Sequence, residues 1–165
     1  MDQTQQSGLF DLTEEQKSKL YIGPFKGDYR WLSNFWESTI TIAGQEYPTV
    51  EHFYQASKTN DAGEAKRILA LETPGQAKRE GAYLTLREDW EEVKTSVMIL
   101  ATYSKYTQNP DLAKMLLKTG ETKIIEVNYW CDNFWGDCRC EKCIDTEGLN
   151  TLGRIIMKVR KDLVT

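Results

Sequence analysis

The sequence predicts a mainly α fold, a single compact helical domain with a small β-hairpin and short strands. Apolar residues recur at helical spacing in residues 87–106 and again in residues 149–163. The polar–apolar alternation typical of strands is confined to short stretches such as residues 39–42. The 165 residues show no internal repeat and no low-complexity linker, and a chain of this length suits one domain.

The first third of the chain begins with a polar, Gln-rich stretch. We expect residues 1–11 to form a flexible tail and place the folded domain at residues 12–165. Thr13 and Gln16 match a capping box, which favours one short helix. Residues 23–36 mix turn formers with aromatic residues and predict an ordered loop, and residues 39–47 predict a hairpin.

The middle of the chain carries a series of helix signals. Thr49 can cap a helix that runs to about residue 59, and Asp61 can cap another. A third helix, to about residue 81, is predicted by the capping-box and proline pattern of residues 73–76. The longest periodic segment then predicts a central helix over residues 87–106, whose apolar residues are Trp90, Val93, Val97, Leu100 and Ala101.

The last third predicts two further helices around a short strand. Asn109 and Pro110 open a helix that the Thr-Gly pair at 119–120 can close, and residues 123–127 resemble a strand. The final helix carries Leu149, Leu152, Ile155, Ile156, Val159 and Leu163.

Composition excludes several classes of protein. No run of roughly 18 apolar residues is present, and residues 1–10 lack the basic and apolar stretches of a secretory signal, so we expect a cytoplasmic protein without membrane contact. A net charge of −4 argues against a protein that coats nucleic acid through a broad basic surface. Individual basic residues could each meet a phosphate, although solvated surface is their ordinary role: Arg30, Lys58, Lys66, Arg67, Lys78, Arg79 and Arg87.

Two segments could carry chemistry. Glu51, Tyr54, Gln55 and Lys58 lie within about 60° of one another on the helix predicted after Thr49. That pattern fits an ordinary solvated helix face as well as a functional one. Residues 128–137 crowd aromatic rings and carboxylates into a segment without periodicity, which suits either a pocket wall or a plug over the core.

The four cysteines lie close together near the C-terminal end. Their spacing is C-x6-C-x-C-x2-C, formed by Cys131, Cys138, Cys140 and Cys143. In a reducing compartment they would not form a disulfide framework, and a structural zinc is possible. Because the second close pair of a regular zinc ribbon is missing, reduced thiols are favoured over zinc. His52 is the only histidine, so it cannot build a His-based metal site or triad, and we expect it to pack or to make one hydrogen bond.

Five segments in order resemble the signature blocks of the NADAR (YbiA-like) family of N-glycosidases. They cover residues 21–163 and read Leu32-Ser33-Asn34-Phe35, then residues 49–58 with the sequence TVEHFYQASK, Trp90, residues 132–137 with the sequence DNFWGD, and residues 148–153 with the sequence GLNTLG. The resemblance implies a mainly helical fold and hydrolysis of an N-glycosidic bond in a ribose-containing substrate. Such a substrate would be ADP-ribose attached to guanine in nucleic acid, or an intermediate of the riboflavin pathway.

Carried over residue by residue, the resemblance implies the catalytic candidates Glu51, Lys58 and Asp132, with no catalytic metal and no cofactor. The candidate substrate-binding residues are Arg30, Asn34, Phe35, Tyr54, Trp90, Trp135 and Gly136. We expect the edge of Trp90 to face the pocket. The Cys-rich stretch after Gly136 departs from the family's short Gly/Asp-rich pattern, which leaves the pocket rim and substrate choice open.

Two mechanisms fit these residues. A carboxylate, Glu51 or Asp132, could stabilise the charge that develops at the anomeric carbon and activate water, while a second, protonated group supplies the leaving nitrogen with a proton. Alternatively, a neutral Lys58 amine could attack the sugar. Two other functions stay open: a non-catalytic ADP-ribose-binding module, and a zinc-stabilised module that binds nucleic acid by stacking bases on its aromatic residues.

Overall fold

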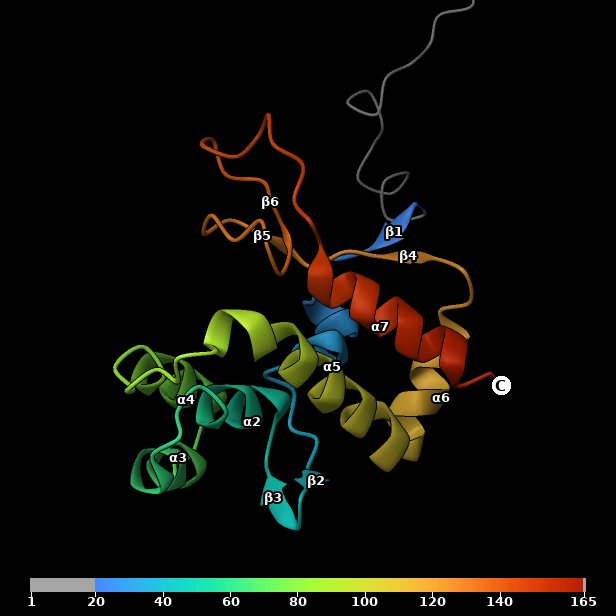
Figure 1. Ribbon diagram of the computed structural model, residues 1–165. Coiled ribbons are helices and arrows are strands. Elements are labelled where there is room, and N and C mark those ends of the chain that lie inside the picture. The colour runs from blue at the N-terminus through green and yellow to red at the C-terminus, as the bar shows by residue number, and fades with distance from the viewer. Residues whose placement is uncertain (1–19, 165) are drawn as a thin grey trace, which may run out of the picture.

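The computed structural model describes residues 20–164 and shows the mainly helical architecture expected from the sequence (Figure 1). Helix α5 (Trp90–Gln108) runs through the middle of the molecule. On one side it packs against α2 (Val50–Ala56), and on the other against α6 (Pro110–Lys118) and α7 (Thr151–Asp162). The long helix therefore connects the two halves of the core.

The helix starts follow the local sequence signals. Thr49 caps α2 by accepting a hydrogen bond from the backbone N–H of His52, and Asp61 caps α3 (Ala62–Leu69) in the same way. Thr73 and Gln76 form both halves of a capping box at α4 (Pro74–Glu80), with the proline in the first turn. These three predicted starts are confirmed. The three short helices pack together on one side of α5 (Figure 1).

Within residues 20–164, the strands form three separate pairs. The predicted hairpin is present as β2 (Ile40–Ile42) and β3 (Gln45–Tyr47), paired antiparallel. Strand β1 (Tyr21–Ile22) pairs in parallel with β4 (Lys123–Ile124). Strand β5 (Val127–Asn128) pairs in parallel with β6 (Asp137–Cys138), so residues 129–136 form a loop whose two ends lie side by side.

Three details differ from the sequence expectations. The strand expected over residues 123–127 is divided into β4 and β5, because residues 125–126 connect two different strand pairs. Helix α2 ends at Ala56 rather than near residue 59. Within the expected loop at residues 23–36, the chain forms the 3-10 helix η2 (Gly27–Leu32), which has no 3.6-residue periodicity to reveal it. The expected tail at residues 1–11 and the capping box of Thr13 and Gln16 lie outside the described residues.

The end of η2 is fixed to the core by a buried lysine. Lys105 in α5 is only 1% exposed, and its Nζ donates hydrogen bonds to the backbone oxygens of Trp31 at 2.7 Å and Ser33 at 2.8 Å. Burial lowers the pKa of Lys105 to about 7. Because Asn34 and Phe35 follow directly, this lysine also positions the segment that carries two of the candidate binding residues.

Among residues 20–164, no helix is both long enough and apolar enough to cross a lipid bilayer.

Replacing Lys105 with methionine tests the role of this contact. The carbonyl of Trp31 would lose its donor in a buried position, so we expect Lys105→Met to lower the free energy of unfolding by roughly 1–3 kcal/mol. Denaturant unfolding monitored by circular dichroism measures the effect. The exposed Lys114→Met is the matched control and should change stability by less than about 0.5 kcal/mol. Equal stability of the two variants would contradict the structural role of Lys105.

Candidate active site

A cavity of about 440 Å³ opens between α2, α4, α5, the start of α7 and two irregular segments. Its volume lies in the range of small-molecule binding sites. The walls combine aromatic rings with charged groups: Phe35, Tyr54, Trp130 and Trp135 on the one hand, and Glu51, Lys58, Lys78, Glu126 and Asp132 on the other. Ser33, Asn34, Gln55 and Asn128 add neutral polar groups. Seven of the ten sequence-predicted catalytic and binding residues therefore meet at one cavity: Asn34, Phe35, Glu51, Tyr54, Lys58, Asp132 and Trp135.

The polar face of α2 is buried, so its interpretation as an ordinary solvated face is wrong. Glu51 is 6% exposed, Tyr54 8% and Gln55 3%. Gln55 Nε2 donates a hydrogen bond of 2.7 Å to Glu51 Oε1. Burial raises the pKa of Glu51, opposed by that hydrogen bond and by the positive charges of Lys78 and Lys58. The carboxyl group is thus held in a poorly hydrated place with cations close by.

Gly81, just after α4, makes room for this arrangement. A Cβ atom at position 81 would lie 1.8 Å from Gln55 Oε1. The absence of a side chain at Gly81 therefore allows the amide of Gln55 to take the orientation in which it reaches Glu51. Sequence reasoning placed Gly81 at the helix end and gave it no part in the site.

Two lysines, Lys58 and Lys78, lie close enough to Glu51 for their charges to affect its pKa. Burial lowers the pKa of Lys58, the charge of Glu51 raises it and the charge of Lys78 lowers it further. Lys78 of α4 was assigned to solvated surface by the sequence, but it lines the cavity. Its ammonium group lies 5.8 Å from the ring centre of Phe35 and 5.4 Å from that of Trp130. The only sequence signal for Lys78 was its charge, because no motif marks it.

Glu126 is a cavity carboxyl group that sequence reasoning missed. Burial raises its pKa to about 7, the nearby charge of Asp132 raises it as well, and Lys78 opposes them. Its Oε2 atom is buried without a hydrogen-bond partner among the described residues. A buried, unpaired carboxyl oxygen at a cavity wall is available to a ligand. Glu126 lies in the short link between β4 and β5, where no periodicity or family block pointed to it.

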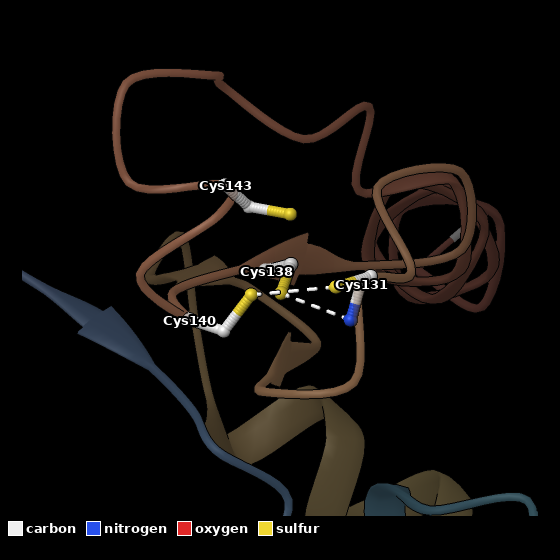
Figure 2. A group of neighbouring side chains, drawn as sticks. All are labelled: Cys131, Cys138, Cys140 and Cys143. Atoms are coloured by element: carbon white, nitrogen blue, oxygen red, sulfur yellow. Dashed lines mark hydrogen bonds between the residues drawn. The ribbon is translucent and has the colours of Figure 1, made fainter.

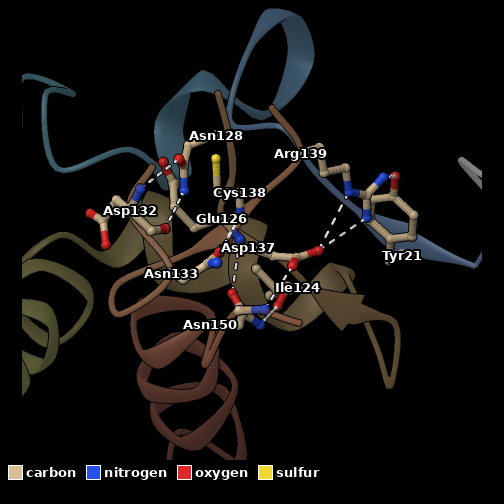
Figure 3. A network of polar contacts seen from close by, with 11 residues as sticks. Tyr21, Ile124, Glu126, Asn128, Asp132, Asn133, Asp137, Cys138, Arg139 and Asn150 are labelled. Carbon is tan, nitrogen blue, oxygen red and sulfur yellow. Dashed lines mark hydrogen bonds and ion pairs between the residues drawn. The ribbon is translucent and has the colours of Figure 1, made fainter. Parts of the chain in front are cut away.

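Asn150 holds the backbone of Glu126 in place. It adopts a left-handed conformation with φ of 49° immediately before α7. Its Oδ1 accepts a hydrogen bond of 2.9 Å from the N–H of Glu126, and its Nδ2 donates one of 2.9 Å to the carbonyl of Ile124 (Figure 3). The block at residues 148–153 therefore contributes in two ways, because Asn150 positions Glu126 and Leu152 lines the cavity.

Asp132 lies at the cavity with one carboxylate oxygen already engaged. Its Oδ1 accepts hydrogen bonds from the N–H groups of Phe134 at 3.1 Å and Trp135 at 2.8 Å. The side chain of Asn128 in turn bonds both the N–H and the carbonyl of Asp132 (Figure 3). Asp132 thus shapes the loop that presents Trp135. Its second carboxylate oxygen accepts neither of these bonds and remains available to a ligand.

Trp90, Arg30 and Gly136 are not among the residues that line the cavity. Trp90 is 5% exposed and packs edge-on against Tyr54, with ring centres 5.1 Å apart, so the expected exposure of its edge to the pocket is not observed. Arg30 is exposed on η2. A Cβ atom at Gly136 would lie 2.2 Å from the carbonyl oxygen of Glu126, so Gly136 permits close packing of the loop behind the cavity wall.

His52 is buried and holds neighbouring segments together. Its Nδ1 lies 2.8 Å from Thr49 Oγ1 and its Nε2 lies 3.1 Å from the carbonyl oxygen of Leu71. It therefore makes two contacts where the sequence suggested packing or a single hydrogen bond. Burial lowers the pKa of His52, and the hydrogen bond to Leu71 opposes this effect. It does not line the cavity.

Known proteins resemble this chain over nearly all of its described part. An N-glycosidase from Nostoc punctiforme is 39% identical over 140 residues, which are 82% of this chain and 86% of that protein. The N-glycosidase YbiA from Escherichia coli is 36% identical over 138 residues, 82% of each chain. A riboflavin biosynthesis protein from Vibrio vulnificus is 37% identical over 138 residues, and the match spans 36% of that protein's length.

The fold agrees with these sequence matches. The NMR structure of the E. coli protein YbiA superposes with a TM-score of 0.75 at 33% identity, covering 87% of this chain and 83% of that one. The NADAR domain, as a family, matches residues 20–164. Since both the sequence matches and the fold extend across the elements that build the cavity, this chain belongs to the NADAR domain family.

Proposed function

We propose that this chain hydrolyses the N-glycosidic bond of a substrate containing ribose and phosphate, with Glu51 and Glu126 as the central catalytic groups. The observation that carries the proposal is the meeting of two buried carboxyl groups, both with raised pKa, in one ligand-sized cavity with aromatic walls and two lysines. N-glycosidase activity in general is supported by family membership, because relatives that align over most of both chains are named N-glycosidases.

The two carboxyl groups can divide the work of bond cleavage. As the bond between the anomeric carbon and nitrogen breaks, positive charge develops on the sugar, and an anionic Glu51 would stabilise it. The same carboxylate would take a proton from the attacking water. Glu126, whose pKa of about 7 keeps a protonated fraction at neutral pH, would give its proton to the departing nitrogen. Burial raises the pKa of Glu51 and disfavours its ionised form, whereas Gln55, Lys78 and Lys58 favour that form and support its use as the base.

The remaining cavity residues suit the other parts of such a substrate. Lys58 and Lys78 provide positive charge for phosphate oxygens. Phe35, Trp130 and Trp135 offer flat faces on which a base can stack. Within this class we propose two substrates, ADP-ribose on guanine in nucleic acid and an intermediate of riboflavin synthesis. The second draws support from relatives named riboflavin biosynthesis proteins in V. vulnificus and in Zea mays.

Lys58 offers a second chemical route, favoured by its lowered pKa and its place beside Glu51. Its neutral amine would attack the anomeric carbon as the bond to nitrogen breaks, and Glu126 would supply the proton to the leaving group. The resulting glycosylamine would open its sugar ring, with the amine proton passing to the ring oxygen, to give a Schiff base that borohydride can reduce. Water would then release the sugar from the lysine. This route uses the same cavity and the same leaving-group acid.

Replacing Glu51 with glutamine tests the central assignment. The amide cannot carry negative charge or accept the proton of water, so we expect Glu51→Gln to lower kcat by about 100-fold or more. Turnover is measured by mass spectrometry on ADP-ribosylated guanine oligonucleotides and riboflavin-pathway nucleotides. Glu72→Gln, at an exposed position that does not line the cavity, is the matched control and should keep full activity.

The same panel separates the alternatives. Substrates bound but left intact by the wild type would indicate a binding-only module. Salt-sensitive binding to generic DNA without hydrolysis would indicate a nucleic-acid-binding module. Full activity in Glu51→Gln would refute the role given to this residue.

The raised pKa of Glu126, together with its proposed role as proton donor, predicts how kcat depends on pH. A proton donor with pKa of about 7 is active below that pH, so kcat should fall as the pH rises through 7. Glu126→Gln should lower kcat by about 100-fold and abolish this alkaline decline. The exposed Glu121→Gln should keep the wild-type profile.

The raised pKa of Glu126 should also make the free energy of unfolding depend on pH. Because the pKa of Glu126 is higher in the folded state than its ordinary 4.5, folding binds a proton between these values. Its contribution to stability is therefore present below about pH 4.5 and lost as the pH rises to about 7. A pH–stability curve that is the same for wild type and Glu126→Gln would contradict the raised pKa.

Borohydride trapping distinguishes the two roles of Lys58. We expect Lys58→Met to lower kcat/KM at least about tenfold by either route, because a charged contact or a nucleophile is lost. A reduced sugar adduct on the peptide containing Lys58 would establish the amine route, whereas its absence would restrict Lys58 to binding. Lys66→Met, at an exposed position on α3, is the control and should leave kcat/KM unchanged. Wild-type kcat/KM in Lys58→Met would exclude both roles.

A further inference from the structure

The four cysteines converge at the end of the molecule that carries β5 and β6 (Figures 1 and 2). Cys138 lies in β6 and is buried, while Cys131, Cys140 and Cys143 come from the loops on either side of it. Their four sulfur atoms all lie within 4.8 Å of one another. The sequence spacing had favoured separate reduced thiols, because it lacks the second close pair of a zinc ribbon. Folding replaces that missing pair by bringing Cys131 next to Cys138 and Cys140.

The distances suit a metal better than disulfides. Four thiolates around zinc, with Zn–S bonds of about 2.3 Å, stand about 3.8 Å apart in a tetrahedron. Cys131 Sγ and Cys140 Sγ are 3.4 Å apart, well beyond a disulfide bond of about 2.05 Å, and all four cysteines are free. Small adjustments of side-chain rotamers would place all the sulfurs at zinc-binding distance.

The backbone around the cluster is arranged toward the sulfurs. Cys131 has a positive φ of 63°, an uncommon conformation for a residue with a side chain. In that conformation its N–H donates to Cys138 Sγ at 3.2 Å (Figure 2). An N–H donor stabilises a sulfur that carries negative charge, which is the form that binds a metal.

The segment that carries the cysteines, residues 129–144, also lacks an apolar core of its own. Tyr129 and Trp130 are each 59% exposed and Ile144 is 68% exposed. Within residues 140–146, the backbone hydrogen bonds from Cys143 N to Cys140 O and from Thr146 N to Cys143 O give only local turns. A segment with so little buried apolar surface needs another source of stability, and in small loop-rich segments a structural metal commonly supplies it.

We propose that Cys131, Cys138, Cys140 and Cys143 bind one structural zinc ion as four thiolates. Binding releases the four thiol protons and changes no oxidation state, giving a centre with a net charge of −2. All four positions of the zinc are filled by protein, so the ion is structural and takes no part in hydrolysis.

The zinc would stiffen one wall of the cavity. Cys131 stands between Trp130 and Asp132, and both neighbours line the cavity. A metal that fixes Cys131 therefore limits the movement of both side chains. The effect of the zinc on substrate binding rests on the proposed function of the cavity. The zinc content of the protein does not depend on that function.

Metal analysis of the full chain, purified without added zinc or chelator, is the first test. We expect one zinc per chain, released when a mercurial reagent titrates four thiols. Cobalt(II) added after zinc removal should give the intense absorption of a tetrahedral thiolate site. Cys140→Ser and Cys143→Ser should each bind zinc at least about tenfold more weakly. Lys142→Ala, an exposed substitution between these two cysteines, should keep the full zinc content.

Hydrogen exchange tests the structural role without a substrate. Removing the metal from the wild type should speed amide exchange in residues 129–143 and leave α5 and α7 protected. Because this comparison uses the unmutated chain, misfolding of a variant cannot produce the result. Substoichiometric zinc with four freely reactive thiols, stoichiometric iron, or intramolecular disulfides in the freshly purified protein would each overturn the proposal.

Discussion

The burial of a polar helix is the constraint on which the rest of this structure depends. Every residue of α2 is buried, including Glu51, His52 and Gln55. A buried polar group without a partner costs on the order of 1–3 kcal/mol, so each of these groups requires a specific neighbour. Thr49 and the carbonyl of Leu71 satisfy His52, and Gln55 bonds Glu51. The contact between His52 and the carbonyl of Leu71 therefore ties α2 to the segment that follows α3.

Burial also gives the cavity its chemical character. Carboxyl groups moved out of water resist ionisation, and those close to lysines resist it less. Glu51 has the cations Lys58 and Lys78 near it, whereas Glu126 has the anion Asp132 as a neighbour in addition to Lys78. Two residues of the same type can therefore differ in protonation inside one cavity. The proposed roles of Glu51 as the base and Glu126 as the acid rest on these different surroundings.

The cavity wall formed by residues 126–138 is held by other interactions than those that hold α2. Residues 126–138 owe their arrangement mainly to side-chain hydrogen bonds, through Asn128, Asp132 and Asn150, and to the close approach that Gly136 allows. Few apolar contacts hold the outer part of this segment, where Trp130 is largely exposed. A zinc ion at the cysteines would therefore stabilise the part of the cavity that the hydrophobic core does not reach. Helix α2, by contrast, is fixed by the core itself.

The sequence by itself determined the features whose causes are local. Thr49, Asp61 and Thr73 cap helices because a side chain can reach a backbone N–H within the same turn. The periodicity of residues 87–106 identified the central helix for a similar reason, since one stripe of apolar residues faces the core. The ordered family blocks identified the NADAR family and brought Glu51, Lys58 and Asp132 forward as candidates.

Only the tertiary structure decided which of these residues share a cavity. Glu126 and Lys78 carry no motif, and they reach Glu51 because the link between β4 and β5, helix α4 and helix α2 meet at one cavity. Trp90 belongs to a family block, yet it lies behind Tyr54 because the apolar face of α5 turns it into the core. The cavity collects residues from Ser33 to Leu152, and the four sulfurs meet across a chain reversal. Local patterns extend over about one turn of helix or one strand, so long-range packing alone could assemble these sites.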